Sequence, residues 1–418
     1  MNISKMTIKM KEQIHFFSGK VSFGLPRVGR RFVEESLFGL ACRQSLRLSE
    51  WGRSLQEKIP LLKTVTRLSR QLNREGLWHH VTTRVLNLAR DKIGRRSLLV
   101  LDLSDLSKSY AKKMEYLSCV HDGSHQSLSE GYWLVQVIAG ESGQGEVMPL
   151  YNRLYSTVGP DFEGENVEII KAVTMVSHGL GSRGVWVIDR GGDRRQLYDF
   201  FLSGRRDFII RLKGDRHVVY KGRRVLARDL AHGCPVLYRE GVIREERDKE
   251  RRYSLGYGFY PVRLPEIPTP LWMVVVFGFG LQPLMLLTTI PLRRSRSALW
   301  WVIQSYLTRW KVEETIRFIK QSYQLEDVRV LTYRRLQNMM ALVLAVAYFT
   351  MTYLTRRLKL KALSRLLLKA SRRIFGIPDF RYYAVSDGIR ELLKHTNTGP
   401  LGPPRWKPPK YQFSLFNP

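Results

Sequence analysis

Two apolar runs of strand length, each ending at an aspartate, constrain the fold most. The run SLLVLDLSD, residues 97–105, becomes polar at Asp102, and the run GVWVIDRGGD, residues 184–193, becomes polar at Asp189 before a Gly-Gly turn. Both patterns are typical of buried strands with an acid at the carboxyl end. In an α/β sheet this edge is where ligands usually bind. The two runs therefore predict an α/β sheet with carboxylates at its functional edge.

The stretch YLTRWKVEETIRFIKQSY, residues 306–323, supplies a third acid. At about 100° per residue, one helix face of roughly 60° holds four functional side chains: Tyr306, Arg309, Glu313 and Lys320. A carboxylate with an Arg one turn before it and a Lys two turns after it suits a polyanion held beside a metal ion. Glu314 points about 100° away, which favours Glu313. The alternative is a solvated amphipathic helix.

The spacing Y-x2-R-x3-E-x6-K resembles the signature of a large group of bacterial insertion-sequence transposases, the DDE enzymes with a ribonuclease-H-like core. LDLSD and VIDRGGD are similar to the segments that carry the first two acids in this family. The resemblance implies that Asp102, Asp189 and Glu313 form the catalytic triad. Asp105 is the alternative candidate for the first acid of the triad. Either aspartate could instead accept hydrogen bonds from the backbone of its own turn.

Three carboxylates suit the chemistry of phosphodiester cleavage by two metal ions. Two divalent ions about 3.5–4 Å apart need several anionic oxygens to hold them, and hard oxygen ligands suit Mg²⁺ or, as a substitute, Mn²⁺. We therefore expect two ions in each active site, held by the three acids.

Further residues are expected to contact DNA. The resemblance implies that Tyr306, Arg309 and Lys320 bind phosphates near the reacting one. Trp310 also matches the family pattern, and could stack on a base or pack on the sheet. Three further basic residues are expected to lie near the DNA end: Arg190, Arg211 and Lys213. The alternative is that they belong to a solvated turn. Asp193 is interpreted as a turn or helix-cap residue.

Glu313 follows Asp189 by 124 residues (313 − 189), which is too long for one connection in a compact domain. The intervening segments have β-like composition with Gly and Pro punctuation: 206–212, 251–264, 271–277 and 284–292. The resemblance implies a ribonuclease-H-like mixed α/β sheet flanked by helices, and these segments indicate that a β-rich insertion interrupts it. We expect helical N- and C-terminal regions.

The expected organisation has five parts. They are a helical DNA-binding region (1–95), the first part of the catalytic core (96–214), the β-rich insertion (215–297), the second part of the core (298–355), and a helical, Pro-rich basic C-terminal region (356–418). The N-terminal region breaks into short amphipathic helices at Pro60 and Gly76. It either contacts the transposon end or only packs on the core.

The segment 339–354 is about as apolar as a membrane helix. Its 16 residues (354 − 339 + 1) fall short of the roughly 20 that a bilayer core needs. We interpret it as a core helix. We interpret the apolar residues around Gly278, Gly280 and Pro283 as a hairpin, because these residues interrupt the run.

A formal net charge of +32 and a pI near 10.3 imply a polyanionic partner. Lys and Arg recur through every segment, which favours double-stranded DNA over a membrane surface. The expected partners are transposon ends and target DNA. The resemblance suggests a homodimer when assembled on DNA.

The three cysteines are far apart and form no C-x-x-C pair, which indicates a reducing compartment and argues against structural zinc. The first 30 residues lack the pattern of a signal peptide. The expected location is a bacterial cytoplasm, in association with the nucleoid.

The resemblance implies a cut-and-paste DNA transposase. Water nicks one strand at the element end, and the freed 3′-hydroxyl then attacks a phosphodiester, in some members by way of a terminal hairpin. Two alternatives stay open: a ribonuclease-H-like structure-specific nuclease, and a non-catalytic DNA-binding protein derived from a transposase.

Overall fold

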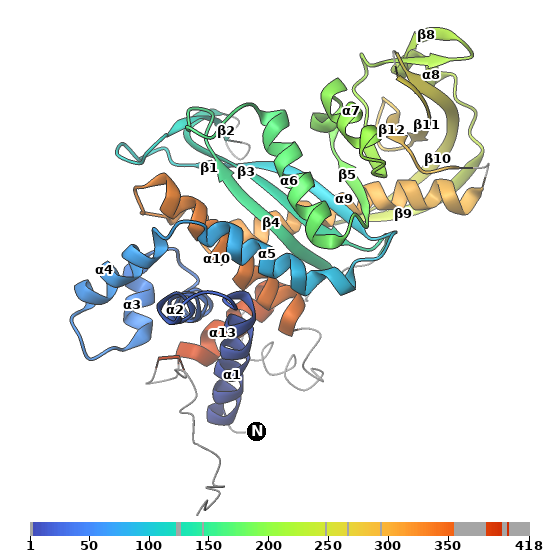
Figure 1. Cartoon of the computed structure of the whole chain (residues 1–418). Coiled ribbons are helices and arrows are strands. Elements are labelled where there is room, and N and C mark those ends of the chain that lie inside the picture. Colours follow the sequence, from blue (N-terminus) through green and yellow to red (C-terminus); the bar gives the residue numbers. More distant parts are fainter. Residues whose placement is uncertain are drawn as a thin grey trace, which may run out of the picture.

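The computed structural model describes residues 3–122, 127–143, 146–246, 249–265, 267–292, 295–354, 382–394 and 399–400. A large mixed sheet forms the centre of the molecule. The N-terminal helices gather at one end, and the strands between β6 and α9 lie at the other (Figure 1).

The first part of the sheet has the strand order β4-β3-β1-β5-β6. Strands β1, β3 and β4 pair antiparallel as a meander, whereas β5 and β6 run parallel to β1. The predicted mixed α/β sheet is therefore confirmed. The strands are β1 (Leu98–Ser107), β2 (Ser118–Asp122), β3 (Ser127–Gly140), β4 (Val147–Tyr155), β5 (Val185–Ile188) and β6 (Phe208–Arg211).

Helices cover both faces of this sheet. Figure 1 shows α6 (Glu165–Leu180) in front of the sheet, with α7 (Arg195–Ser203) beside it, and α9 (Arg296–Ser322) passing behind. All four residues of β5 are buried, because both of its faces are covered. The apolar run VWVI therefore specifies a central strand.

The segment after β6 continues the same sheet. Strand β12 pairs antiparallel with β6 through Leu286 and Arg211, and the order continues as β12-β11-β10-β7-β8. The predicted hairpin is confirmed, because Val274 in β11 pairs with Leu286 in β12. The elements are β7 (His217–Tyr220), β8 (Arg223–Leu226), α8 (Ala227–His232), β9 (Tyr238–Glu246), β10 (Lys249–Leu264), β11 (Ile267–Phe277) and β12 (Leu284–Thr288).

The apolar helix α10 (Tyr333–Tyr348) lies in the protein core. It continues into a π-helical turn, η4 (Phe349–Tyr353). The helix Tyr333–Tyr353 is long and apolar enough to cross a membrane, but 94% of its most apolar 18-residue stretch is buried inside the structure. The core-helix interpretation agrees with this burial.

The N-terminal region is helical up to β1. The predicted breaks are confirmed, because Pro60 and Gly76 are the residues before two helix starts, and Gly76 has a φ of 70°. The elements are α1 (Ile3–Val21), α2 (Arg27–Arg43), α3 (Leu48–Leu55), α4 (Leu61–Leu72), α5 (Leu77–Ala89) and η1 (Arg90–Lys92).

Buried polar contacts hold this N-terminal region on the core. The side-chain amide of Asn338 in α10 donates to the carbonyls of Leu72 and Arg74, each at 2.8 Å, and accepts from the backbone N–H of Trp78 at 2.9 Å. One amide thus satisfies the end of α4 and the start of α5 together. The N-terminal helices are therefore fixed relative to the sheet.

The C-terminal region is described only in part. Helix α13 (Tyr382–Lys394) packs against α1, α2 and α9. Most of the predicted C-terminal region 356–418, including nearly all of its Pro-rich part, lies outside the described residues.

Candidate active site

Strand β1 carries two of the predicted acids. The sequence pattern suggested that the strand ends near Asp102, and this was wrong: β1 continues to Ser107, so Asp102 and Asp105 both lie within it. The strand extends because its polar half pairs with β3, where Asp102 faces Gln136 and Asp105 faces Trp133. Cross-strand pairing outweighs the polar composition that suggested a loop.

Asp189 stands at the carboxyl end of β5, as predicted. It precedes the short 3₁₀ helix η2 (Arg190–Gly192), and its Oδ1 accepts the backbone N–H of Gly191 at 2.7 Å. The Gly-Gly pair has a packing cause, because a Cβ at Gly192 would lie 2.6 Å from Cγ2 of Ile188. The turn is therefore drawn close against the strand, which fixes where Asp189 projects.

Helix α9 presents the remaining predicted residues. It begins at the cap Ser295, whose hydroxyl accepts from the backbone N–H of Ala298, and it runs without a break for 27 residues. Because it contacts both β1 and β5, its buried face lies against the two strands that carry the aspartates. Glu313 is 44% exposed, so it lies at the open side of this contact.

Arg309 lies at the centre of the site. Its Nη2 forms an ion pair with Oε1 of Glu313 at 2.7 Å, and its Nη1 lies 3.8 Å from Oδ1 of Asp102. Burial lowers the pKa of Arg309, but the charges around it outweigh this and raise the pKa above its usual value. The groups that raise it are, in order of effect, Tyr306, Glu313, Asp102 and Asp189. The structure thus brings the three predicted acids around one guanidinium.

The carboxyl group of Asp102 is strongly perturbed. Burial is the main cause that raises its pKa to about 7. Arg309 opposes this change, whereas the nearby carboxylates of Asp189 and Glu313 add to it. Carboxylates that repel one another in this way are typical of sites that hold cations.

Lys320 forms a separate ion pair. Its Nζ lies 3.5 Å from Oδ1 of Asp105, about three helical turns beyond Arg309. The two aspartates of β1 therefore have different partners: Asp102 lies beside Arg309, and Asp105 lies beside Lys320. This separation supports Asp102 over Asp105 as the member of the acid group.

The two predicted aromatic residues are placed differently. Tyr306 is only 2% exposed, and its ring lies 5.7 Å from the guanidinium carbon of Arg309. Trp310 is half-buried and packs edge-on against Phe279, at 5.5 Å between ring centroids. Both rings therefore pack within the protein, and their contact with DNA stays a prediction.

The other predicted basic residues lie in the turn after β5, at the end of β6 and in the loop that follows it. Arg190 and Lys213 are exposed, and Arg211 is partly buried. They are not brought into contact with the three acids by any ion pair among the described residues. Their role at DNA stays a prediction.

Asp193 has a role that the sequence analysis missed. Its side chain is fully buried and joins the turn after β5 to the loop after β6. It accepts from the backbone N–H of Lys213 at 2.7 Å, from Nε of Arg216 at 2.7 Å, and from the hydroxyl of Tyr198 at 3.0 Å. A turn aspartate gives no sequence signal for a partner 23 residues away, so only the fold reveals this connection.

The carboxylate oxygens of the three acids are suitable ligands for divalent ions, but the three carboxylates do not converge on one point in this structure. Among the residues that the structure describes, no three Asp, Glu, His or Cys side chains stand close enough to hold one metal ion. The guanidinium of Arg309 is itself the positive charge between Asp102 and Glu313. The carboxylates are hard oxygen ligands of the kind that Mg²⁺ prefers, and Arg309 provides the positive charge between two of them in this structure.

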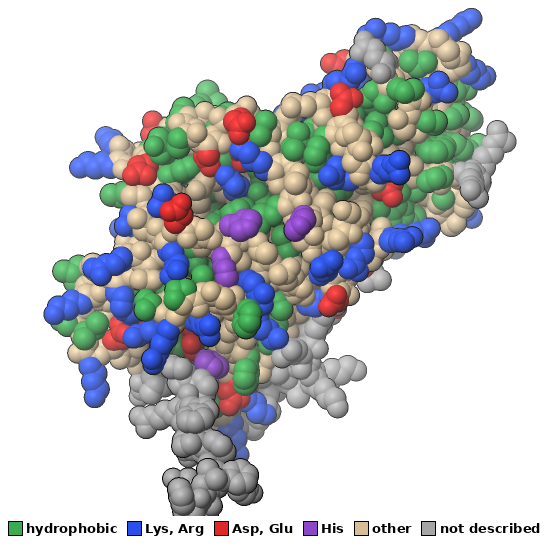
Figure 2. Space-filling model, viewed as in Figure 1, with side chains coloured by type: hydrophobic (Ala, Val, Ile, Leu, Met, Phe, Trp, Pro, Cys, Tyr) green, Lys and Arg blue, Asp and Glu red, His purple; other side chains and the backbone are tan. Residues whose placement is uncertain are grey.

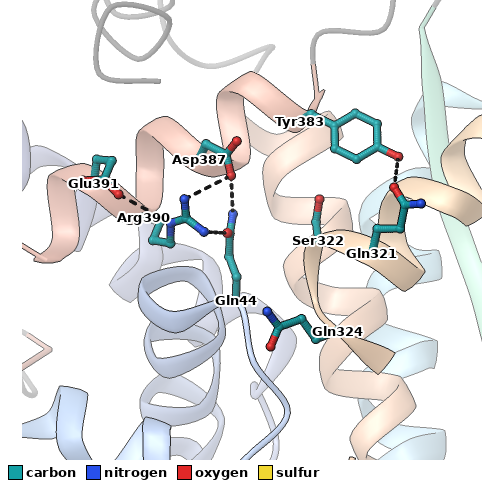
Figure 3. A pocket seen from close by; sticks show the side chains of 8 residues that line it. All are labelled: Gln44, Gln321, Ser322, Gln324, Tyr383, Asp387, Arg390 and Glu391. Atoms are coloured by element: carbon teal, nitrogen blue, oxygen red, sulfur yellow. Dashed lines mark hydrogen bonds and ion pairs between the residues drawn. The ribbon is translucent and has the colours of Figure 1, made fainter. Parts of the chain in front are cut away.

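A polar pocket of about 350 Å³ lies beyond Lys320, where α9 ends against α2 and α13 (Figure 3). Arg390 donates to Oε1 of Gln44 at 2.6 Å, and Tyr383 donates to Oε1 of Gln321 at 3.1 Å. The lining residues are Gln44, Gln321, Ser322, Gln324, Tyr383, Asp387, Arg390 and Glu391. None of the three acids lines it, so it is separate from the candidate active site.

Basic side chains are spread over the visible face of the molecule. Figure 2 shows Lys and Arg over the N-terminal helices and over the strands at the opposite end, with acidic side chains sparser over this face as a whole. Exposed members on α2 to α4 and the adjoining loop are Arg27, Arg30, Arg31, Arg53, Lys58, Lys63 and Arg70. This spread agrees with the high net charge of the sequence.

Comparison with known proteins finds a match to a family model and a likeness to solved structures. A cryo-EM structure of the piggyBac transposase synaptic complex with hairpin DNA is similar at a TM-score of 0.44 and 11% identity, covering 92% of this chain and 77% of that one. A TM-score of this size does not establish a shared fold. No curated protein matches the chain. Residues 162–349 match the family described as the transposase DDE domain, a segment that contains Asp189 and Glu313. This match supports a DDE transposase.

Proposed function

We propose that this protein is a cut-and-paste DNA transposase of a bacterial insertion sequence, of the group with the Y-x2-R-x3-E-x6-K signature. The observation that carries the proposal is the convergence of Asp102, Asp189 and Glu313 around one guanidinium, from two strands and a helix distant in sequence. The match to the transposase DDE domain supports it independently.

In this proposal the three acids hold two Mg²⁺ ions. The ions would supply activation of water or of a 3′-hydroxyl and stabilisation of the leaving oxygen. The protein contributes fixed positions for the carboxylates. Asp189 is held by its turn and Asp102 by strand pairing, whereas the partly exposed Glu313 closes the site from the side that DNA would approach.

The cations of α9 are proposed to bind the DNA backbone. Arg309 suits a phosphate because its planar fork can make two parallel hydrogen bonds, and Lys320 adds a point charge further along the helix. Tyr306 would also bind a phosphate when its buried hydroxyl becomes exposed. The exposed side chains of Arg190 and Lys213 would contact phosphates of the DNA strand further from the reacting phosphate.

The remaining surface is proposed to hold the transposon end and target DNA. The exposed basic side chains of α2 to α4 make the N-terminal helices suited to a duplex, with binding that weakens steeply as salt increases. We further propose a homodimer on DNA and action in the cytoplasm, in association with the nucleoid.

A strand-transfer assay tests the function. The full-length protein is mixed with Mg²⁺, a pre-cut duplex that carries the terminal sequence of its own element, and a plasmid target. We expect joined products that require a free 3′-hydroxyl on the end. A cut plasmid without joined product would identify a nuclease instead of a transposase. DNA binding with neither product would identify a non-catalytic binding protein.

A further inference from the structure

We propose that the guanidinium of Arg309 competes with the metal ions for the carboxylates, and that it passes to a DNA phosphate when metal binds. Metal binding and DNA binding then reinforce each other through this one side chain. The inference rests on the proposed function, since it assigns the acids to metal and the arginine to DNA.

The first argument is where the guanidinium lies. Its two terminal nitrogens reach Glu313 at 2.7 Å and Asp102 at 3.8 Å, and the side chain is only 11% exposed. A divalent ion bound by the same carboxylates would lie within a few ångströms of this charge. Like charges at such distances repel by several kcal/mol where water is largely excluded. The guanidinium and the ions therefore cannot share the acids at full strength.

The second argument is that Arg309 is poorly satisfied in this position. Its Nε is buried and has no hydrogen-bond partner among the described residues, and the same holds for the adjacent hydroxyl of Tyr306. The distance of 3.8 Å to Asp102 is too long for a hydrogen bond. A buried donor without a partner carries a free-energy penalty. A phosphate offers the bidentate geometry that this guanidinium lacks here.

The third argument is the different environment of a second arginine on the same helix. Arg317 pairs with Glu314 at 2.6 Å on the surface, and its side chain is 61% exposed. It has no ion pair with the three acids among the described residues. Both arginines lie on α9 and pair with a glutamate, but only Arg309 is buried against the acid group, so Arg317 is the control for loss of one positive charge from this helix.

Linkage gives the consequence. If metal displaces Arg309 from the acids and DNA stabilises the displaced position, each ligand must increase the affinity for the other by the same factor. Such couplings typically lie between about 5- and 150-fold. The side chain would thereby restrict metal loading to protein that already holds DNA.

The test is Mn²⁺ binding to the full-length protein without DNA, followed by the EPR signal of free Mn²⁺. We expect Arg309→Gln to tighten Mn²⁺ binding at least about fivefold, and Arg309→Lys to tighten it less, because Lys keeps the charge. The matched substitution Arg317→Gln should change the affinity by less than about twofold, because its pair is solvent-exposed. Circular dichroism and thermal melting check that each variant is folded.

The outcomes separate this inference from the proposed function. A Glu313→Gln variant that binds Mn²⁺ as well as the unmutated protein would overturn the proposed function, and the inference with it. If Glu313→Gln weakens binding but Arg309→Gln leaves it unchanged or also weakens it, the inference alone is overturned. An equal increase in affinity from Arg317→Gln would likewise overturn it, because the effect would then be general charge removal.

A second readout measures the coupling directly. The dissociation constant for a short duplex is measured by fluorescence anisotropy with and without Mn²⁺, at constant ionic strength. We expect Mn²⁺ to tighten DNA binding at least about fivefold in the unmutated protein, and by a clearly smaller factor in Arg309→Gln. Equal factors in the two proteins would contradict the proposal.

Discussion

Replacement of Glu313 by glutamine is expected to lower the rate of strand cleavage by about 10³-fold or more, because metal ions supply several kcal/mol of transition-state stabilisation. Glutamine keeps the size of the side chain and can still accept from Arg309, so the helix should stay intact. Affinity for the element end should be equal or slightly higher, because one negative charge is lost. A single-turnover cleavage assay and a binding titration check both expectations.

The neighbouring Glu314 provides the control. It pairs with Arg317 on the surface, so Glu314→Gln should leave the cleavage rate within about twofold and change stability by less than about 1 kcal/mol. If Glu313→Gln cleaved as fast as the unmutated protein, Glu313 could not be the third acid. Equal losses in the two variants would point to disruption of α9 instead of loss of a metal ligand.

Replacement of Asp102 by asparagine is expected to stabilise the protein in the absence of metal, and to do so more as the pH increases. The folded protein holds a proton on Asp102 up to a pH of about 7, whereas the unfolded chain releases it near the usual pKa of 3.8. The unmutated protein therefore loses stability between these two values, and asparagine, which mimics the protonated acid, does not. The advantage should grow by about 2–3 kcal/mol between pH 5 and pH 8, and it has an upper limit of about 4 kcal/mol.

Urea unfolding in the presence of EDTA measures this advantage at the two pH values. Asp199→Asn is the control, because Asp199 pairs with Arg195 on the surface at 3.0 Å and should give a difference that hardly changes with pH. Addition of Mn²⁺ should stabilise the unmutated protein and not the Asp102→Asn variant. A constant difference between the variant and the unmutated protein across this pH range would show that Asp102 is not held in an unfavourable charged state.

The central strands and the shared helix face of Arg309 and Glu313 could be predicted because their signals are local. The apolar run before Asp189 specifies a fully buried strand, and the i, i+4 spacing of Arg309 and Glu313 places both on one helix face. The helix starts at Pro60 and Gly76 were predictable for the same reason, because the backbone preferences of these residues act within one turn.

The features that were missed depend on long-range pairing. The extension of β1 to Ser107 is stabilised by β3, whose pairing residues lie well downstream, so the polar composition around Asp105 was misleading. The pairing of β12 with β6 makes the expected insertion continuous with the main sheet, and no local pattern indicates it. The proposed division into domains at these boundaries stays a prediction.

The side-chain environment of the site was also beyond local reasoning. The helix face correctly grouped Tyr306 with Arg309, but the burial of the phenol depends on how α9 packs on the sheet. The partner of Asp105 could be identified only once β1 and α9 were in place, when Lys320 proved to lie beside it. The connection between Asp193 and Arg216 has the same character.

The account depends most on the three acids sharing two divalent ions. The most direct measurement is anomalous scattering from Mn²⁺ in crystals of the protein bound to a pre-cut element end. We expect two peaks about 3.5–4 Å apart, contacted by the carboxylates of Asp102, Asp189 and Glu313, with Arg309 turned toward a phosphate. Peaks bound by other side chains, with these three carboxylates free of metal, would contradict the account.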